Sequence, residues 1–144
     1  MAKSSSSALV PAPPEQVWQT LADFGGISRW GTGVDQSSLL TDVSQGLGAT
    51  RRVQVGRNAV RETITAWQPG KQLAYRLIGL PPVIREAVNT WELTAEGTAT
   101  AVTLTAQVKT KGGPLIARLV ARRLGRINKD LVAGLRDHHR KAAA

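Results

Sequence analysis

The sequence predicts an α+β fold in which a curved, seven-stranded antiparallel sheet wraps around one long C-terminal helix. Segments of alternating apolar and polar residues fill the chain between Val34 and Val108, and this is the period of strands that are covered on one face. The links between these segments are short, which favours antiparallel neighbours. From Pro114 to about His139 the apolar residues recur at helical spacing instead.

The N-terminal segment predicts a first strand over residues 4–10 and then two short helices. Pro14 suits the first turn of a helix, because its missing N–H has no helical partner there. Apolar residues then recur at helical spacing to about Asp23, and the Gly25–Gly26 pair is expected to end this helix. A second helical turn is expected over residues 27–30.

Six further strands are expected after this second turn, separated by glycine- and proline-rich links. On these strands one face should be buried, because apolar and polar residues alternate. By this alternation Glu62 shares the buried face with Ile64, whereas Trp67 faces outward. The expected strands cover residues 35–41, 49–56, 59–68, 72–79, 86–96 and 99–109.

The long helix is expected to have an apolar stripe and a basic face. At ~1.5 Å per residue it spans roughly 40 Å, enough to cross a small sheet. One helix cannot fill the whole concave side, so large side chains or a cavity must occupy part of it. The neighbouring His138 and His139 fall at the expected helix end, where the helix dipole favours protonated histidine as a cap. The apolar stripe comprises Ile116, Leu119, Val120, Leu124, Ile127, Leu131 and Leu135.

Length and composition restrict the function. The 144 residues, 42% hydrophobic and 20% charged, predict one globular domain over residues 1–144. No apolar run reaches the roughly 18 residues of a membrane span, and the N-terminal residues lack the apolar core of a secretory signal, so a cytoplasmic location is expected. The chain has no cysteine, two histidines and no carboxylate cluster, so we expect no metal site and no cofactor.

The positive charge is concentrated in the last quarter of the chain. The net charge is +9, and the segment from Lys109 to Ala144 holds ten Lys/Arg against two Asp. Such a segment is either a solvated helix face or a weak contact for an anionic membrane or RNA. Aromatic residues make up 4% and do not alternate with the basic ones, which disfavours base stacking. The residues for such a contact are Arg118, Arg122, Arg126 and Lys129.

Three segments carry a resemblance to a known superfamily. They are VPAPPEQVWQTLADFGGISRWGTGV (Val10–Val34), RETITAWQPGKQLAYRLIG (Arg61–Gly79) and LVAGLRDHH (Leu131–His139). In this order they resemble the START-like, or SRPBCC, helix-grip superfamily, and within it the polyketide cyclase/dehydrase and lipid-transport group. The resemblance implies an elongated pocket between the sheet and the long helix. It does not decide the function, because lipid carriers, hormone receptors and aromatase/cyclases share this fold.

The resemblance also implies where ligand-binding residues lie. It places Trp30, Leu80 and Pro81 at the pocket mouth, with Trp30 as a gate because the glycines around it permit loop motion. The expected concave face comprises Arg51, Glu62, Ile64, Tyr75 and Trp91, and the expected roof comprises Leu124, Ile127 and Leu131.

Glu62 is the most informative of these residues. A carboxylate on an apolar face must be paired or neutralised, and Arg51 and Tyr75 are its natural partners. The group is then either a structural ion pair or a general base or ligand anchor, which makes Glu62, Arg51 and Tyr75 the catalytic candidates.

The sequence favours binding of a small hydrophobic or amphipathic ligand, with or without transport. It gives less support to an enzyme activity. The first alternative is a polyketide cyclase or aromatase. The second is a protein that associates with ribosomes, RNA or anionic membranes through its basic helix.

Overall fold

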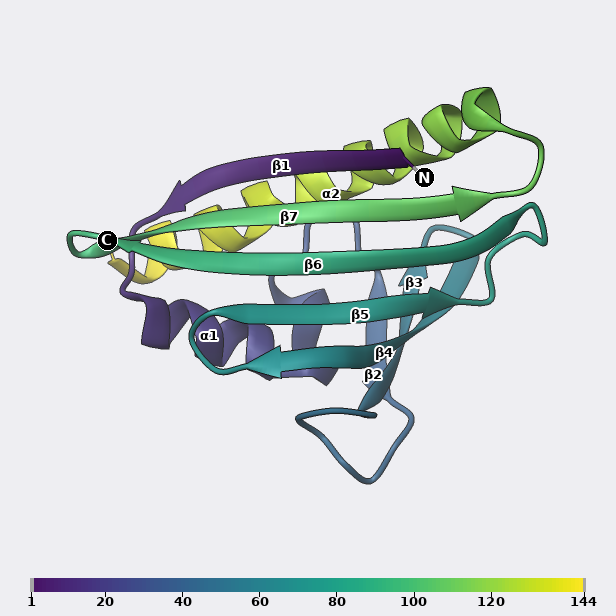
Figure 1. Cartoon of the computed structure of the whole chain (residues 1–144). Coiled ribbons are helices and arrows are strands. Elements are labelled where there is room, and N and C mark those ends of the chain that lie inside the picture. The colour runs from purple at the N-terminus through teal and green to yellow at the C-terminus, as the bar shows by residue number, and fades with distance from the viewer. Residues whose placement is uncertain (1, 144) are drawn as a thin grey trace.

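The computed structural model describes residues 2–143 and confirms the predicted order of elements (Figure 1). Strand β1 (Ala2–Val10) precedes α1 (Pro14–Ala22) and a 3-10 helix, η1 (Phe24–Arg29), which are the two short helices expected. The chain continues as β2 (Gln36–Leu39), β3 (Thr50–Val55), β4 (Asn58–Gln68), β5 (Gln72–Ile78), β6 (Ile84–Glu96), β7 (Ala99–Thr110) and α2 (Pro114–Ala143).

The seven strands form one antiparallel sheet in the order β1-β7-β6-β5-β4-β3-β2. Strands β2 to β7 follow each other as neighbours, and β1 closes the far edge by pairing with β7. Helix α2 runs along β1 and β7 on one side of the sheet (Figure 1). Helix α1 lies on the same side and contacts β6 and β7. Along β7 burial alternates from Thr100 to Val108, as expected of a sheet covered on one face. This is the predicted helix-grip architecture.

Helix α2 comes closest to the sheet where both carry small residues. A Cβ added to Gly125 would overlap the side chain of Ser4 in β1. The serine run of β1 therefore offers a shallow surface beneath the helix. On the outer face of the same strand, Ser5 and Ser7 form hydrogen bonds of 2.9 and 3.0 Å with threonines of β7.

This close approach overturns part of the apolar stripe predicted for α2. Leu119 is exposed, and Leu124 and Ile127 are only half-buried, as are Ile116 and Val120. Ala117 and Ala121 are buried in their place, because the short distance to the sheet leaves no room for larger side chains. In the second half of the helix Leu131 and Leu135 are buried as predicted.

The ends of two helices differ from the prediction. Helix α1 ends at Ala22, and Gly25 and Gly26 lie inside η1 rather than terminating α1. A salt bridge of 2.6 Å between Asp23 and Arg29 passes over Gly26, where a side chain would collide with it. Helix α2 continues to Ala143, so the two histidines lie before its end.

The prediction that Trp67 faces outward is wrong. The register of β4 against β5 shifts between Ile64 and Ala66, so that Trp67 stands opposite the buried Leu73. A one-residue bulge of this kind turns every later side chain of the strand to the other face. Trp67 accordingly packs edge-to-face against Trp18 of α1, with 5.0 Å between ring centroids.

The hydrophobic core fills the space between the inner face of the sheet, α1, η1 and the second half of α2. It contains large aromatic side chains from three of these elements, among them Trp18, Phe24 and Trp91. Within residues 2–143, no helix combines the length and the apolarity that crossing a membrane requires.

Candidate ligand-binding site

A buried ion pair between Arg51 and Glu62 lies within the apolar core. The two residues are direct partners in the β3–β4 register, so alternation points both side chains inward. Arg51 Nε donates to Glu62 Oε1 at 2.8 Å, and Nη2 lies 2.8 Å from the same oxygen. The side chains are only 3% and 8% exposed. Of the two partners predicted for Glu62, Arg51 is the one that bonds to it.

Arg51 also joins the sheet to η1. Its Nη1 donates to the carbonyl oxygen of Phe24 at 2.9 Å. The guanidinium carbon lies 3.8 Å from the centroid of the Phe24 ring and 4.7 Å from that of Tyr75. Two aromatic faces, a carboxylate and a carbonyl therefore compensate the buried positive charge. Arg51 holds β3, β4, β5 and η1 together.

Tyr75 is fully buried and is kept neutral by its surroundings. Burial raises the pKa of the Tyr75 phenol above its ordinary value, and the negative charge of Glu62 raises it further, against a smaller lowering by Arg51. Its oxygen accepts a hydrogen bond of 3.3 Å from Trp91 Nε1. The phenol therefore stays protonated at neutral pH, as a potential proton donor inside the core.

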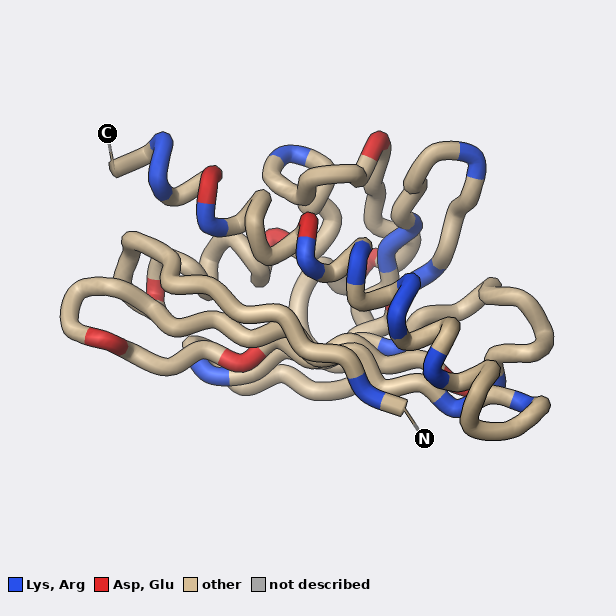
Figure 2. The backbone as a smooth tube through the Cα atoms, turned by 90° about the horizontal axis from the view of Figure 1, so that it is seen from above, with Lys and Arg blue, Asp and Glu red and all other residues tan. Residues whose placement is uncertain are grey.

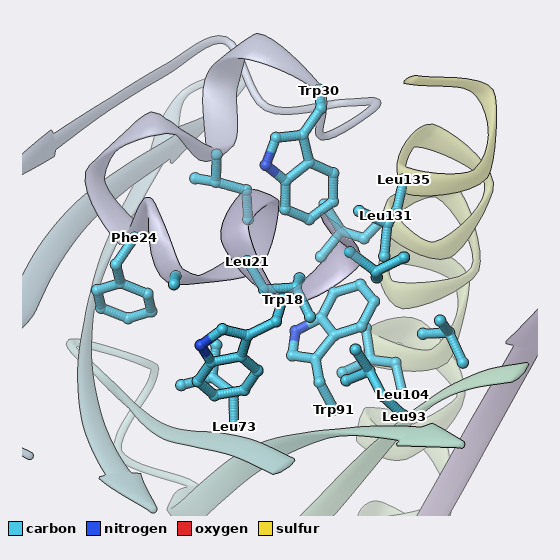
Figure 3. Packing of buried hydrophobic residues seen from close by; sticks show 14 of the residues in the cluster. Trp18, Leu21, Phe24, Trp30, Leu73, Trp91, Leu93, Leu104, Leu131 and Leu135 are labelled. Carbon is cyan, nitrogen blue, oxygen red and sulfur yellow. The ribbon is translucent and has the colours of Figure 1, made fainter. Parts of the chain in front are cut away.

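Trp30 covers this aromatic group from the side of α2. Figure 3 shows its indole above Trp91 and facing Leu131 and Leu135. The Trp30 and Trp91 rings meet edge-to-face with 5.9 Å between centroids. Trp30 is 9% exposed, and its Nε1 is buried without any hydrogen-bond partner among the described residues. A buried N–H of this kind costs roughly 1–3 kcal/mol when it lacks an acceptor.

The backbone around Trp30 is closely packed at one of the glycines that flank it. Gly31 is buried, and a Cβ there would lie 2.9 Å from the Ile27 carbonyl oxygen and 3.1 Å from Leu131 Cδ2. The Trp30 carbonyl lies directly against Gly134 of α2. Gly31 and Gly134 thus permit the close packing of this segment against η1 and α2.

A second polar contact lies between the sheet and the middle of α2. Asn128 Nδ2 donates to Asn89 Oδ1 at 3.0 Å, and Asn89 Nδ2 donates in return at 3.4 Å. Both residues are buried, and Asn89 is the register partner of Tyr75. Sequence reasoning missed this pair. The signal was a polar residue at an inward position of β6, between Ala87 and Trp91.

The predicted site residues fall into two groups. The structure brings together Trp30, Arg51, Glu62, Ile64, Tyr75, Trp91 and Leu131, all buried. The other four are less buried: Pro81 is exposed, and Leu80, Leu124 and Ile127 are half-buried. None of the four belongs to the packed core cluster. In the described conformation the aromatic core thus fills the inner end of the expected pocket.

Open hollows lie elsewhere on the surface. One of about 410 Å³ is lined by residues of β1, β7 and the end of β6, among them Leu9 and Thr103. Another of about 500 Å³ lies beside the β4–β5 turn and the end of β6. No predicted ligand-binding residue lines either hollow. A ligand at the aromatic group would have to displace side chains.

His139 connects the C-terminal part of α2 to α1 instead of capping α2. It is buried, and its Nε2 lies 2.9 Å from the Thr20 hydroxyl oxygen of α1. Burial lowers the pKa of His139 below its ordinary 6.5, and the neighbouring His138 lowers it further. The folded protein therefore favours neutral His139, and the expected protonated cap is wrong for this residue.

We expect this histidine to make the fold less stable in mild acid. A pKa depressed in the folded state stabilises the protein above the unfolded-state value, and this stabilisation is lost as pH falls below about 6.5. The free energy of unfolding, measured by urea titration between pH 7.5 and 5, should fall less steeply in His139→Gln than in the unmodified protein. His138→Gln, at an exposed position, should keep most of the slope. Equal slopes in His139→Gln and the unmodified protein would contradict this assignment.

Comparison with known proteins agrees with the fold. Residues 1–140 match the family model described as polyketide cyclase / dehydrase and lipid transport. No curated protein matches the chain. Among solved structures, the Zhui aromatase/cyclase from Streptomyces sp. R1128 is similar with a TM-score of 0.79 at 17% identity, over 99% of this chain and 96% of that one.

Two further structures have similar overlap. A START superfamily protein from Mycobacterium smegmatis has a TM-score of 0.79 at 15% identity, over 97% of this chain and 98% of that one. The protein XoxI from Bacillus cereus has a TM-score of 0.82 at 16% identity, over 100% of this chain and 99% of that one. At such identities the structures establish the fold, and the family model establishes membership. The chain belongs to the polyketide cyclase / dehydrase and lipid transport family.

Proposed function

We propose that this protein binds a small hydrophobic or amphipathic molecule between the sheet and α2, and that the molecule carries a hydrogen-bond acceptor. One observation carries the proposal, namely the buried indole N–H of Trp30 without a partner. An unpaired donor makes the closed packing of Trp30 costly. A carbonyl or ether oxygen placed against it would remove that cost.

The surroundings of Trp30 favour an apolar and aromatic ligand. Trp91 offers a ring edge or face on one side, and Leu131 and Leu135 offer aliphatic surface on the other (Figure 3). Burying ~300 Å² of ligand apolar area at ~25 cal/mol/Å² contributes about 7–8 kcal/mol before the cost of association. The net affinity is then micromolar, as suits a carrier or a sensor.

Trp30 is the gate in this proposal. Its backbone is held by Gly134 and by the short contacts of Gly31, so the indole must swing about its side-chain bonds. The half-buried Leu124 and Ile127 of α2 and Leu80 of the β5–β6 link lie outside the packed cluster. They supply an apolar path by which a ligand reaches the indole N–H once the Trp30 side chain has turned.

A second candidate function is a polyketide cyclase or aromatase activity, the kind named for the Zhui structure and the family model. Its support is the contact among Arg51, Glu62 and Tyr75, a buried charge pair beside a phenol that stays protonated. Against it, all three donors of Arg51 that make contacts serve η1 and β4. The Arg51–Glu62 pair therefore stabilises the fold, and we prefer ligand binding to catalysis as the proposed function.

The test uses two aromatic probes of nearly equal size, 2-acetylnaphthalene with a carbonyl and 2-ethylnaphthalene without one. Calorimetric titration should show micromolar binding of both. Because a hydrogen bond to Trp30 contributes about 1 kcal/mol, Trp30→Phe should weaken the ketone roughly fivefold and leave the hydrocarbon within about twofold.

Trp67→Phe is the matched control, since it removes a different indole, which is half-buried and packs against the same core. It should leave the ratio of the two affinities unchanged. Binding of neither probe would refute the proposed pocket. Equal weakening of both probes by Trp30→Phe would refute the role of its N–H. Native mass spectrometry of the freshly purified protein then identifies any compound that co-purifies.

A further inference from the structure

We propose that the outward face of the first half of α2 docks on an anionic phospholipid bilayer. The face begins with two leucines, Leu115 and Leu119, which are 69% and 56% exposed. They lie one helical turn apart and therefore form one apolar patch. Exposing two leucine side chains to water is energetically unfavourable, and the fold does not require it.

The geometry of α2 separates this patch from the protein's own core. Ala117 and Ala121 are the buried residues of the same turns. At 3.6 residues per turn, Leu115 and Leu119 point roughly opposite to them. The helix therefore presents a small-residue face to the sheet and a leucine face to the surroundings. No described residue covers the leucine face.

A cluster of free positive charges surrounds the leucines. Residues 109–129 include seven Lys/Arg and no Asp or Glu. Five of these lie exposed on α2, namely Arg118, Arg122, Arg123, Arg126 and Lys129, and none of the five forms an ion pair within residues 2–143. Figure 2 shows blue segments alone along this half of the helix, whereas red segments appear in the half nearer the C-terminus.

The second half of the same helix provides an internal contrast. There Asp137 lies 3.4 Å from Arg136 and 3.8 Å from Arg140, so both of these arginines have an acidic partner. Apart from Lys141 near the C-terminal end, the basic residues of α2 without an ion pair among the described residues thus lie in the half that also exposes leucines. An amphipathic helix with basic residues around an apolar patch is suited to an anionic membrane surface.

The β5–β6 link extends this surface. Lys111, which precedes α2, donates its backbone N–H to the Val83 carbonyl oxygen at 2.8 Å. Pro81, Pro82 and Val83 of that link are exposed. Three further apolar side chains and one further cation therefore stand beside the start of the helix. They allow shallow insertion at this end of the molecule while the rest of the sheet stays in water.

The chemistry favours lipid over nucleic acid. The chain has four Trp, one Tyr and one Phe. Each of these six side chains is buried or half-buried, so within the described residues none is free to stack on a base. Exposed leucines add nothing to phosphate contact but gain by insertion among acyl chains. We therefore assign a bilayer as the partner, and RNA becomes an outcome of the test.

The test is flotation of the purified protein with vesicles of phosphatidylcholine containing about a third phosphatidylserine, compared with pure phosphatidylcholine vesicles, at 0.1 M salt. Binding to the anionic vesicles only is expected. Because each arginine near the surface contributes roughly fivefold, Arg122→Gln with Arg126→Gln should weaken binding about tenfold or more. Leu115→Ser with Leu119→Ser should weaken it by a similar factor.

Two matched double variants control for charge and for hydrophobicity. Arg136→Gln with Arg140→Gln removes the same charge from the half of α2 in which these two arginines pair with Asp137. Leu40→Ser with Leu47→Ser removes two exposed leucines from the link between β2 and β3. Both should bind within about twofold of the unmodified protein. All changed positions other than Arg136 are exposed, and thermal unfolding of each variant verifies that it folds.

Three results would overturn the proposal. One is no binding to the anionic vesicles at 0.1 M salt. Another is that the test and control variants weaken binding equally. The third is that an RNA oligonucleotide binds more tightly than the vesicles, through the arginines and without any effect of the leucine changes. The result does not depend on whether a ligand binds at Trp30, so failure here leaves the proposed binding function intact.

Discussion

Replacing Arg51 with Met is expected to lower the free energy of unfolding by about 3–5 kcal/mol, because the variant leaves the Glu62 carboxylate buried without its counter-charge. Glu62 has an 8% exposed side chain and both contacts from Arg51 go to its Oε1 oxygen, so solvent cannot replace the guanidinium. The Phe24 carbonyl oxygen also loses its donor. Urea unfolding followed by circular dichroism measures the loss.

The double variant Arg51→Met with Glu62→Leu separates charge from packing. Removing both charges eliminates the desolvation cost, and replacing a buried pair with apolar residues is often neutral or better. Only the Phe24 carbonyl then lacks a partner, at about 1–2 kcal/mol. The double variant should therefore recover most of the stability that the single variant loses.

Arg52→Met is the control for arginine loss on the same strand. Its side chain points to the other face and donates to Gln54 at 3.2 Å, and its removal should cost less than about 1 kcal/mol. If the double variant is as unstable as Arg51→Met alone, the ion pair is not what the single variant breaks. If it is stable and still binds the naphthalene probes, the pair serves the fold and is not required for binding.

The Arg51–Glu62 pair also shows why part of the site could be predicted from sequence. Both residues stand at inward positions of adjacent strands, and alternation with short turns is enough to bring them together. Alternation together with the family resemblance also placed Ile64, Tyr75 and Trp91 on the buried face. Strand periodicity is local and regular, so the face that each side chain occupies can be predicted from its position in the strand.

Periodicity failed where tertiary packing alters it. The bulge after Ile64 reverses the face of Trp67, and no residue type in that segment predicts a bulge. On α2, the apolar spacing predicted a buried Leu119, yet the helix turns its alanines to the sheet. A hydrophobic pattern says that a face is apolar, but not how closely the partner approaches. The unpaired Trp30 N–H is likewise a product of three-dimensional packing.

Gly134→Ala is expected to destabilise the fold by about 2 kcal/mol, although alanine is the better helix former. The new Cβ would collide with the Trp30 carbonyl oxygen and lie 2.7 Å from the Thr32 backbone nitrogen. These are backbone atoms that cannot rotate away, so α2 must move from the segment that follows η1. Overpacking costs about 1–3 kcal/mol, occasionally more, and it outweighs the gain of at most about 1 kcal/mol in helix propensity.

The same substitution tests how the gate is held. If the Gly134 contact fixes the Trp30 backbone, its loss shifts the tryptophan fluorescence to longer wavelength as the indole becomes wetter. Gly125→Ala is the matched control, because its Cβ meets only the Ser4 side chain, whose hydroxyl can turn aside. That variant should lose less than half as much stability and leave the fluorescence unchanged. Equal losses in the two variants would mean that helix packing in general, rather than the contact beneath Trp30, is being measured.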